Sequence, residues 1–141
     1  MTKTVRGACY CGAVRFEADL PADEVGHCHC DNCRRAQGAA FLTFAIFPDE
    51  RFRVVGGEDE LTRYVDAGGS TRGFCRVCGS TFIYASPRWP GTTIAVANLL
   101  DPLDQPATRH YYADRAPAWG PIHDDLPRFG GESGEEPLPP L

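Results

Sequence analysis

The sequence contains no apolar run near the roughly 20 residues that a membrane-spanning helix needs, and its first ten residues hold no apolar segment of the kind found in secretion signals. It also lacks excess positive charge, since the net charge is -5 and Lys3 is the only lysine. Nucleic acid binding requires a concentrated positive field, so we expect neither a nucleic acid nor a membrane as partner. These absences favour a cytoplasmic protein.

Helix signals are also scarce, because 15 glycines and 12 prolines interrupt the 141 residues. Only residues 31–37 predict a helix, with Asp31 as N-cap and Gly38 as its stop. Apolar and charged contents are near globular averages, so we expect one folded domain over residues 1–129. The Gly, Pro and Glu residues of 130–141 bury too little to offset the entropy of ordering, which predicts a flexible acidic tail.

Short runs of alternating or β-branched apolar residues predict strands. Residues 13–20 alternate apolar and polar side chains, as a half-buried strand does, and residues 39–47 are almost continuously apolar. Residues 21–26 between them are expected to form a turn. Further strands are expected at residues 52–55, 61–65, 81–85, 92–97 and 109–113. The sequence therefore predicts a mainly β fold of short antiparallel strands with little helix.

Seven cysteines are many for a chain without an export signal. In a reducing compartment clustered thiols bind metal more often than they form disulfides. Each cysteine has another cysteine close to it in the sequence. The three groups are Cys9 and Cys11; Cys28, Cys30 and Cys33; Cys75 and Cys78.

The first and last groups resemble the two halves of a structural zinc site. Cys11 and Cys78 are each followed directly by glycine, which allows the tight turn of a zinc knuckle. Together with Cys9 and Cys75 they would give a closed four-thiolate site. Two alternatives stay open, namely free or disulfide-linked thiols, and iron in the same thiolate cage.

The middle group has three thiols and no fourth cysteine to complete it. Three protein ligands with one open position are typical of a catalytic zinc site. His27 or His29 is an alternative fourth ligand, which would close the site. A further alternative is a metal-free redox pair formed by Cys30 and Cys33.

Two arginines follow this group directly. Arg34 and Arg35 would offset the negative charge of a three-thiolate zinc site and offer donors for a substrate carboxylate. The open position suits a substrate thiol, because zinc deprotonates a bound thiol. Such a site makes or breaks carbon–sulfur bonds.

The sequence resembles the glutathione-dependent formaldehyde-activating enzyme family, also called the centromere-protein-V domain family, over about residues 4–129. The segments that carry the resemblance are 7–12, 28–35 with Gly38, 74–80, and the late residues His110, Trp119 and 125–129.

The resemblance implies a Mss4-like β-tent with one structural zinc and a second, reactive and labile zinc. Cys9, Cys11, Cys75 and Cys78 would hold the first ion, and Cys28, Cys30 and Cys33 the second. The implied activity is the condensation of glutathione with formaldehyde, classed in reverse as a carbon–sulfur lyase reaction.

Three further residues are expected to contact the substrate, namely Arg34, Asn98 and Trp119. His123, beside Asp124, is a candidate proton shuttle; another side chain or water is the alternative. The leading hypothesis is a zinc-dependent carbon–sulfur lyase acting on adducts of a small glutathione-like thiol with an aldehyde. The alternative is a non-catalytic, zinc-stabilised module that binds a protein.

Overall fold

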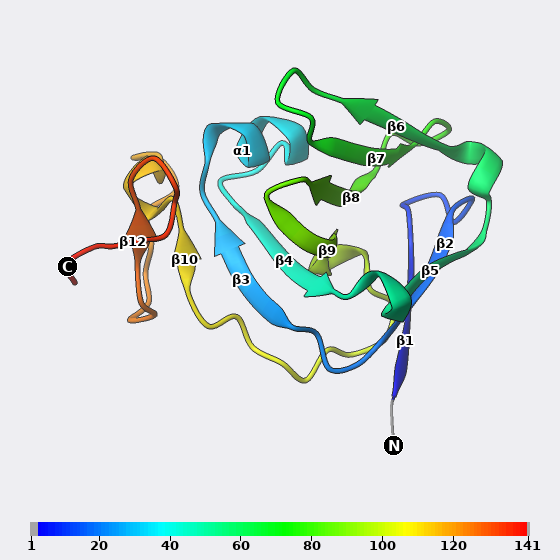
Figure 1. Cartoon of the computed structure of the whole chain (residues 1–141), viewed down its shortest axis with the longest axis horizontal. Helices are drawn as coiled ribbons and strands as arrows, with labels where there is room; N and C mark the ends of the chain where they lie inside the picture. Colours follow the sequence, from blue (N-terminus) through cyan, green and yellow to red (C-terminus); the bar gives the residue numbers. More distant parts are fainter. Residues whose placement is uncertain (1–2, 141) are drawn as a thin grey trace. The chain divides into compact units, whose positions relative to one another are not determined.

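The computed structural model describes residues 3–140 and divides the chain into two compact units. The first contains Met1–Asp23 and Ala45–Gln105, and the second contains Glu24–Phe44 and Pro106–Leu141. Short strands are the main regular structure of both units (Figure 1), which confirms the predicted mainly β class. The Mss4-like β-tent stays a prediction. Among the described residues, no helix has the length and apolar character to cross a bilayer.

An antiparallel three-stranded sheet begins the first unit. Its strands, in spatial order, are β1 (Thr4–Ala8), β2 (Arg15–Asp19) and β5 (Phe52–Gly56). The fully buried ring of Phe16 on β2 stacks on Phe82, with ring centroids 5.5 Å apart. Burial of a side chain of this size contributes about 1.5–3 kcal/mol, so β2 supplies the centre of this unit's core.

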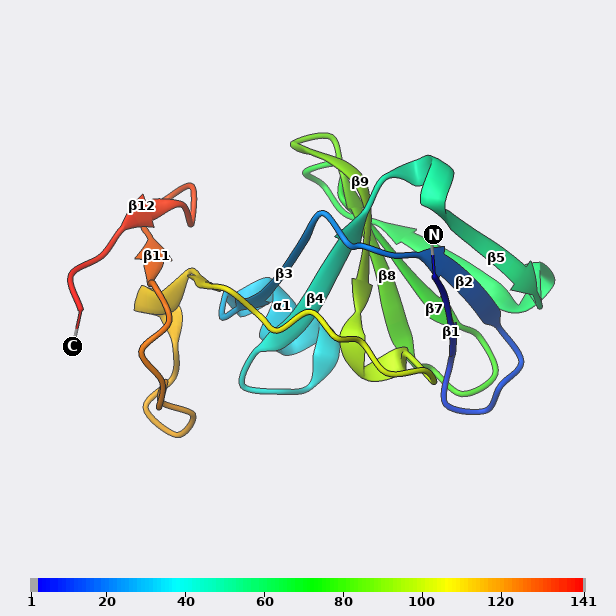
Figure 2. The ribbon, with the colours of Figure 1, turned by 90° about the horizontal axis from the view of Figure 1, so that it is seen from below.

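Four further strands of the first unit form successive antiparallel hairpins. They are β6 (Leu61–Val65), β7 (Thr71–Cys75), β8 (Thr81–Ser86) and β9 (Trp89–Ala95), of which β7, β8 and β9 run side by side in Figure 2. Short 3-10 turns join or follow strands at η1 (Asp49–Arg51), η2 (Glu58–Glu60) and η3 (Val96–Asn98).

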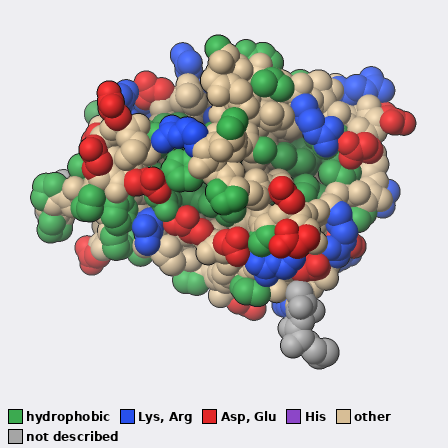
Figure 3. All heavy atoms as spheres, viewed as in Figure 1, with side chains coloured by type: hydrophobic (Ala, Val, Ile, Leu, Met, Phe, Trp, Pro, Cys, Tyr) green, Lys and Arg blue, Asp and Glu red, His purple; other side chains and the backbone are tan. Residues whose placement is uncertain are grey.

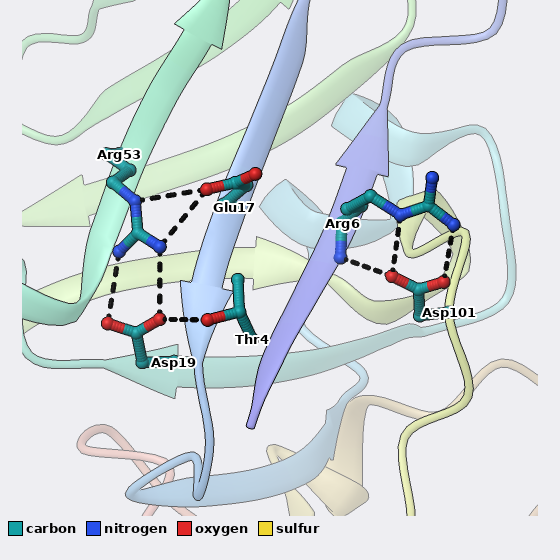
Figure 4. Close-up of polar contacts among 6 residues, drawn as sticks. All are labelled: Thr4, Arg6, Glu17, Asp19, Arg53 and Asp101. Atoms are coloured by element: carbon teal, nitrogen blue, oxygen red, sulfur yellow. Dashed lines mark hydrogen bonds and ion pairs between the residues drawn. The ribbon is translucent and has the colours of Figure 1, made fainter. Parts of the chain in front are cut away.

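Ion pairs hold the exposed side of the three-stranded sheet (Figure 4). Arg53 on β5 donates hydrogen bonds to Glu17 and Asp19 on β2, at 3.0–3.3 Å. Asp101 accepts from the backbone amide and the guanidinium of Arg6, and this pairing lowers the pKa of Asp101 to about 2. Exposed pairs of this kind add little stability each, and their main effect is to fix which residues face one another.

The second unit contains the only α-helix of the described residues. Its elements are β3 (Glu24–Cys28), α1 (Asp31–Gln37), β10 (His110–Tyr111), η4 (Ala113–Arg115), β11 (Phe129–Gly130) and β12 (Glu136–Pro137). Strand β10 pairs with β3 in parallel, an exception to the expected antiparallel order. Strand β4 (Leu42–Phe47) begins in this unit and ends in the first.

Helix α1 has the predicted bounds but a different N-cap. Cys30 is the cap, and its Sγ accepts a hydrogen bond from the Cys33 amide at 3.2 Å. Asp31 is instead the first helical residue, and its carboxylate pairs with Arg34. Gly38 ends the helix in the left-handed conformation, as expected.

The two-residue strands β11 and β12 were not predicted. Nor were three longer strands, β1, β3 and β7, and the turn expected over residues 21–26 gives way to β3 from Glu24 onward. Each of the three longer strands has a glycine in its interior, which lowers strand propensity. In β1 a Cβ on Gly7 would lie 2.1 Å from the ring of Phe16, and in β7 one on Gly73 would lie 3.0 Å from Ile83. The glycines therefore make room for a neighbouring side chain on the sheet.

The segment expected to be a flexible tail carries local structure as far as the end of β12 at Pro137, and Leu141 lies outside the described residues. Strands β11 and β12 pair, and the amide of Gly131 donates to Asp114 of η4. The described residues from 106 onward cluster with the second unit, and the domain boundary expected at residues 129/130 stays a prediction. Mobility of residues 130–141 stays a prediction.

Charges of both signs are interspersed on the face of the molecule drawn in Figure 3. Basic side chains on this face lie among acidic ones, and no broad area of one sign is visible. The absence of a nucleic acid partner stays a prediction, consistent with this mixed surface.

Candidate metal centres and thiol site

A four-cysteine cluster lies in the first unit. Cys9 and Cys11 follow β1, Cys75 ends β7, and Cys78 lies in the turn to β8. Their four sulfur atoms all lie within 4.8 Å of one another. The structure thus brings together the two cysteine pairs that the sequence proposed as halves of one site.

The sulfur spacing matches a tetrahedral zinc site. Cys9 and Cys11 have their sulfurs 3.7 Å apart, and Cys11 and Cys75 have theirs 3.8 Å apart. Four sulfurs at the usual Zn–S distance of about 2.3 Å would be separated by about 3.8 Å. Both the donor set and its geometry therefore fit zinc.

Backbone amides in the two turns support thiolate at this cluster. Gly12 and Gly79 have φ near +80°, and no atom lies within 4 Å of a Cβ built on either. Amides of Val14 and Val77 donate to the sulfurs of Cys9 and Cys75 at 3.3 and 3.4 Å. In the second turn, a hydrogen bond from the Ser80 backbone is the main cause that lowers the pKa of the Cys78 thiol to about 6.

Asn98, predicted to bind substrate, joins the two turns of this cluster. Its Nδ2 donates to the carbonyl oxygen of Ala8 and to Oγ of Ser80, both at 3.0 Å. Ala8 directly precedes the first cysteine turn, and Ser80 directly follows the second. The side-chain amide protons are thus used within the first unit, and a role in substrate binding stays a prediction.

A three-cysteine cluster lies in the second unit. Cys28 ends β3, Cys30 caps α1, and Cys33 lies in the first turn of that helix. Their three sulfurs lie within 4.8 Å of one another, and no ring nitrogen of His27 or His29 belongs to the group. In the described residues this cluster has three protein donors, which fits the open site rather than the closed alternative.

The crowding of three sulfurs favours a cation between them. The pKa of Cys30 is lowered, chiefly by a hydrogen bond from Cys28 and then by one from Cys33. The pKa of Cys28 is raised, chiefly by its hydrogen bond to Cys30. One thiolate forms readily here, whereas further ionisation accumulates negative charge that a bound divalent metal would neutralise. The donor set therefore fits zinc, although thiolate sulfur also suits other soft metals.

Arginines lie around the start of α1. Arg34 donates from Nε to the carbonyl oxygen of His29 at 3.2 Å and from Nη2 to Asp31 at 2.6 Å. Its Nη1 has no partner among the described residues, so part of the guanidinium is available to an anion. Arg115 of η4 approaches Asp31 at 3.7 Å, and Arg35 is exposed.

Trp119 lies in the loop after η4 and is 71% exposed. The next residue, Gly120, packs against Ala40, where an added Cβ would lie 2.7 Å from the Ala40 Cβ. Phe41 follows Ala40, and its ring contacts His27 and His29. The loop with Trp119 is thus held beside the segment that follows α1, and its contact with substrate stays a prediction.

A buried chain of histidines was not predicted. His29 Nε2 lies 2.8 Å from His110 Nδ1, and His110 Nε2 lies 2.8 Å from Asp124 Oδ1. The sequence had grouped Asp124 with its neighbour His123, which is exposed; the shuttle role of His123 stays a prediction. Residues 29 and 110 are far apart in sequence, and nothing local to either one indicates their contact.

Comparison with known proteins matches one family model and several individual proteins. The sequence pattern of the family described as "Glutathione-dependent formaldehyde-activating enzyme" matches residues 4–115. A Halomonas elongata protein named as a candidate glutathione-dependent formaldehyde-activating enzyme is 31% identical over 123 residues, covering 82% of this chain and 78% of that protein. An uncharacterized lyase of Schizosaccharomyces pombe is 27% identical over 79 residues, which are 56% of each chain.

A solved structure gives a similar match. The crystal structure of a Rhodobacter sphaeroides protein superposes with a TM-score of 0.57 at 31% sequence identity. The match covers 70% of this chain and 91% of that one.

Proposed function

The chain belongs to the glutathione-dependent formaldehyde-activating enzyme family, and on this premise we propose that it is a zinc-dependent enzyme of carbon–sulfur lyase type. Its substrates would be a small thiol such as glutathione and an aldehyde such as formaldehyde. The observation that carries the proposal is the convergence of three cysteine sulfurs with no fourth protein donor among the described residues. A purely structural site has no need of such an open position.

The chemistry is a reversible addition. The thiol sulfur bonds to the carbonyl carbon, the C=O π electrons move to oxygen, and oxygen takes up the proton that the thiol gave up. The product is an S-hydroxymethyl thioether, and cleavage of its C–S bond regenerates thiol and aldehyde. A zinc ion held by Cys28, Cys30 and Cys33 would supply the lowered thiol pKa that makes the sulfur nucleophilic at neutral pH.

The chain's own residues would bind and orient the thiol. The unpartnered Nη1 of Arg34 is suited to a substrate carboxylate, because the rest of its guanidinium is fixed by His29 and Asp31. The exposed ring of Trp119 offers an apolar surface to the aldehyde or to the thiol's backbone. Asn98, in the first unit, already donates both amide protons, so only its Oδ1 is left for a ligand, and its contact with substrate stays a prediction.

A specific observation supports the alternative of a protein-binding module. Tyr10 and Val77 lie within the two cysteine turns of the first unit and are 92% and 62% exposed. Exposed apolar residues at the tips of metal-stabilised turns are suited to contact a protein partner. The two functions are separated by whether a thiol reaches the three-cysteine cluster.

Alkylation of the cysteines in the presence of glutathione tests the proposal. We expect glutathione to slow modification of Cys28, Cys30 and Cys33. The extent of modification at each cysteine is measured by mass spectrometry of peptides. Because free glutathione also consumes the reagent, exposed Cys11 serves as the internal control: consumption slows all cysteines alike, whereas binding protects the three-cysteine cluster selectively. Parallel slowing of both clusters would count against the enzyme and favour the binding module.

Turnover is the second measurement. NMR exchange between formaldehyde and glutathione should be faster with the protein than in buffer alone, and the Cys30→Ser variant should lose the acceleration. An unchanged exchange rate with metal-loaded protein would contradict the proposed reaction.

A further inference from the structure

The buried histidine chain of the second unit runs from the protein surface to the peptide between two cysteines of the three-cysteine cluster. The Asp124 side chain is 46% exposed, that of His110 is 4% exposed, and His29 is 1% exposed. Both links of the chain are 2.8 Å long, which is a good hydrogen-bond distance. Ring stacking also holds His110 in place, since the His27 ring lies over the His110 ring with centroids 5.0 Å apart.

The direction of these hydrogen bonds follows from their chemistry. An ionised carboxylate only accepts, so His110 must donate to Asp124 from Nε2. In the neutral form of His110 its Nδ1 accepts, and His29 must then donate to it from Nε2. Ionisation of Asp124 is supported by its pKa, which the hydrogen bond from His110 lowers. Both rings are thereby fixed as Nε2–H tautomers, and Nδ1 of His29, buried and without a protein partner, is left unprotonated.

The backbone of His29 is held as tightly as its ring. Its amide donates to the carbonyl oxygen of Tyr111 at 3.0 Å, and its own carbonyl accepts from Arg34. His29 lies between Cys28 and Cys30 in the sequence, yet its ring nitrogens are not part of the sulfur cluster. The His29 backbone links Cys28 to Cys30, so its orientation sets how the two cysteine side chains are directed.

We propose that Asp124 and His110 are positioning residues of the three-thiolate site, which fix the orientation and tautomer of His29 and so keep Cys28 and Cys30 converged. The inference rests on the metal site of the proposed function, but not on its substrates. Groups that hydrogen-bond directly to metal ligands typically contribute about 10–100-fold to metal affinity, and because Asp124 and His110 act through His29, we expect an effect at the lower end of that range. The chain also attaches the loop that bears Trp119 to the metal-binding segment.

The test compares Asp124→Asn with Asp125→Asn in the full-length chain. The two changes are chemically identical and adjacent, but Asp125 is exposed and has no side-chain partner among the described residues. Competition with a chromophoric chelator measures zinc affinity at the weaker of the two sites. We expect Asp124→Asn to weaken that site about 10-fold and Asp125→Asn to leave it unchanged. The loss in Asp124→Glu should be smaller than in Asp124→Asn, because the carboxylate is kept.

Imidazole nitrogen NMR supplies a readout that a merely structural role would not move. We expect Nε2–H tautomers for His29 and His110 in the wild-type protein and in Asp125→Asn. In Asp124→Asn the carboxamide can donate to His110 Nε2, so the tautomers of both histidines can reverse. If Asp124→Asn does not fold, the tautomers in the wild-type spectrum and the zinc affinity of Asp124→Glu still test the inference.

Two results would overturn the inference. One is an Nδ1–H tautomer on either histidine of the wild-type protein, and the other is unchanged zinc affinity in a folded Asp124→Asn variant. Neither readout uses turnover. Failure to join glutathione to formaldehyde would therefore contradict the proposed function and leave this inference standing.

Discussion

At the scale of single residues, a substitution at Asn98 can distinguish a structural role of this side chain from a role in substrate binding. Both amide protons are donated, to Ala8 and Ser80, so Asn98→Ala leaves two acceptors without a partner. We expect the free energy of unfolding to fall by about 1–3 kcal/mol, measured by urea denaturation of the metal-loaded protein. Ser80→Ala removes one of these acceptors and should cost less. A normal stability with weakened thiol binding in Asn98→Ala would instead assign the residue to the substrate.

Tyr111 gives a second prediction at this scale. Its hydroxyl donates to Glu24, and burial first, then this hydrogen bond, raises the pKa of the phenol. Above pH about 10, Tyr111 therefore keeps its proton in the folded state, whereas an unfolded tyrosine loses its proton. The stability that the protonated Tyr111 contributes is fully present below pH about 10 and is lost as the pH rises further.

An absorbance titration of the five tyrosines measures this effect. We expect Tyr111→Phe to remove the step at highest pH, whereas Tyr64→Phe, at an exposed position, should leave that step in place. Loss of a step near pH 10 in the Tyr111→Phe variant would show that the buried hydrogen bond does not hold the proton.

At the scale of elements, backbone conformation, and not lack of space, restricts which residues can replace the glycines of the two cysteine turns. Gly12 and Gly79 have positive φ, and a Cβ there would meet no other atom. Alanine at either should cost about 1–2 kcal/mol, the penalty of the left-handed conformation. Gly57 also has positive φ, but a Cβ on it would lie 1.8 Å from the carbonyl oxygen of Ala13.

We therefore expect Gly57→Ala to destabilise more than Gly12→Ala or Gly79→Ala, with all three measured by urea unfolding in the presence of zinc. Equal losses at the three positions would mean that the backbone near Gly57 relaxes freely.

The sequence predicts strands correctly where the intrinsic preference of the local residues agrees with their place in the folded sheet. Strands β5, β6 and β8 are rich in β-branched and aromatic residues, and their predicted bounds lie within one residue of those observed. Strands β1, β3 and β7 contain glycines whose purpose is close approach to a side chain on another strand, such as Phe16 over Gly7. That reason lies in the tertiary structure, so propensity alone could not reveal it.

The candidate site divides in the same way. The two cysteine clusters were predictable because close spacing and thiolate chemistry restrict what the residues can do. The link between His29 and His110 joins residues 81 positions apart. Only the parallel pairing of β10 with β3 brings these residues together, and no short motif encodes it.

At the scale of the whole molecule, each unit contains one cysteine cluster, and the two clusters should respond differently to loss of a ligand. The four-cysteine cluster joins positions 64 apart, Cys11 and Cys75, inside the first unit, and Cys75 is fully buried. A closed zinc site can contribute on the order of 10 kcal/mol of apparent folding free energy. Cys78→Ser should therefore give unfolded or insoluble protein.

Cys30→Ser is the matched change in the second unit. Serine is a preferred N-cap, so its hydroxyl can replace Cys30 Sγ as acceptor for the Cys33 amide and preserve the start of α1. We expect this variant to remain folded and to bind about one zinc per chain, against about two for the wild type, by elemental analysis and circular dichroism. A mild chelator should likewise remove one zinc from the wild type first, because three ligands hold an ion less firmly than four. If both variants lost their fold equally, the three-cysteine cluster would be a second structural site, and the open position on which the proposed chemistry depends would not exist.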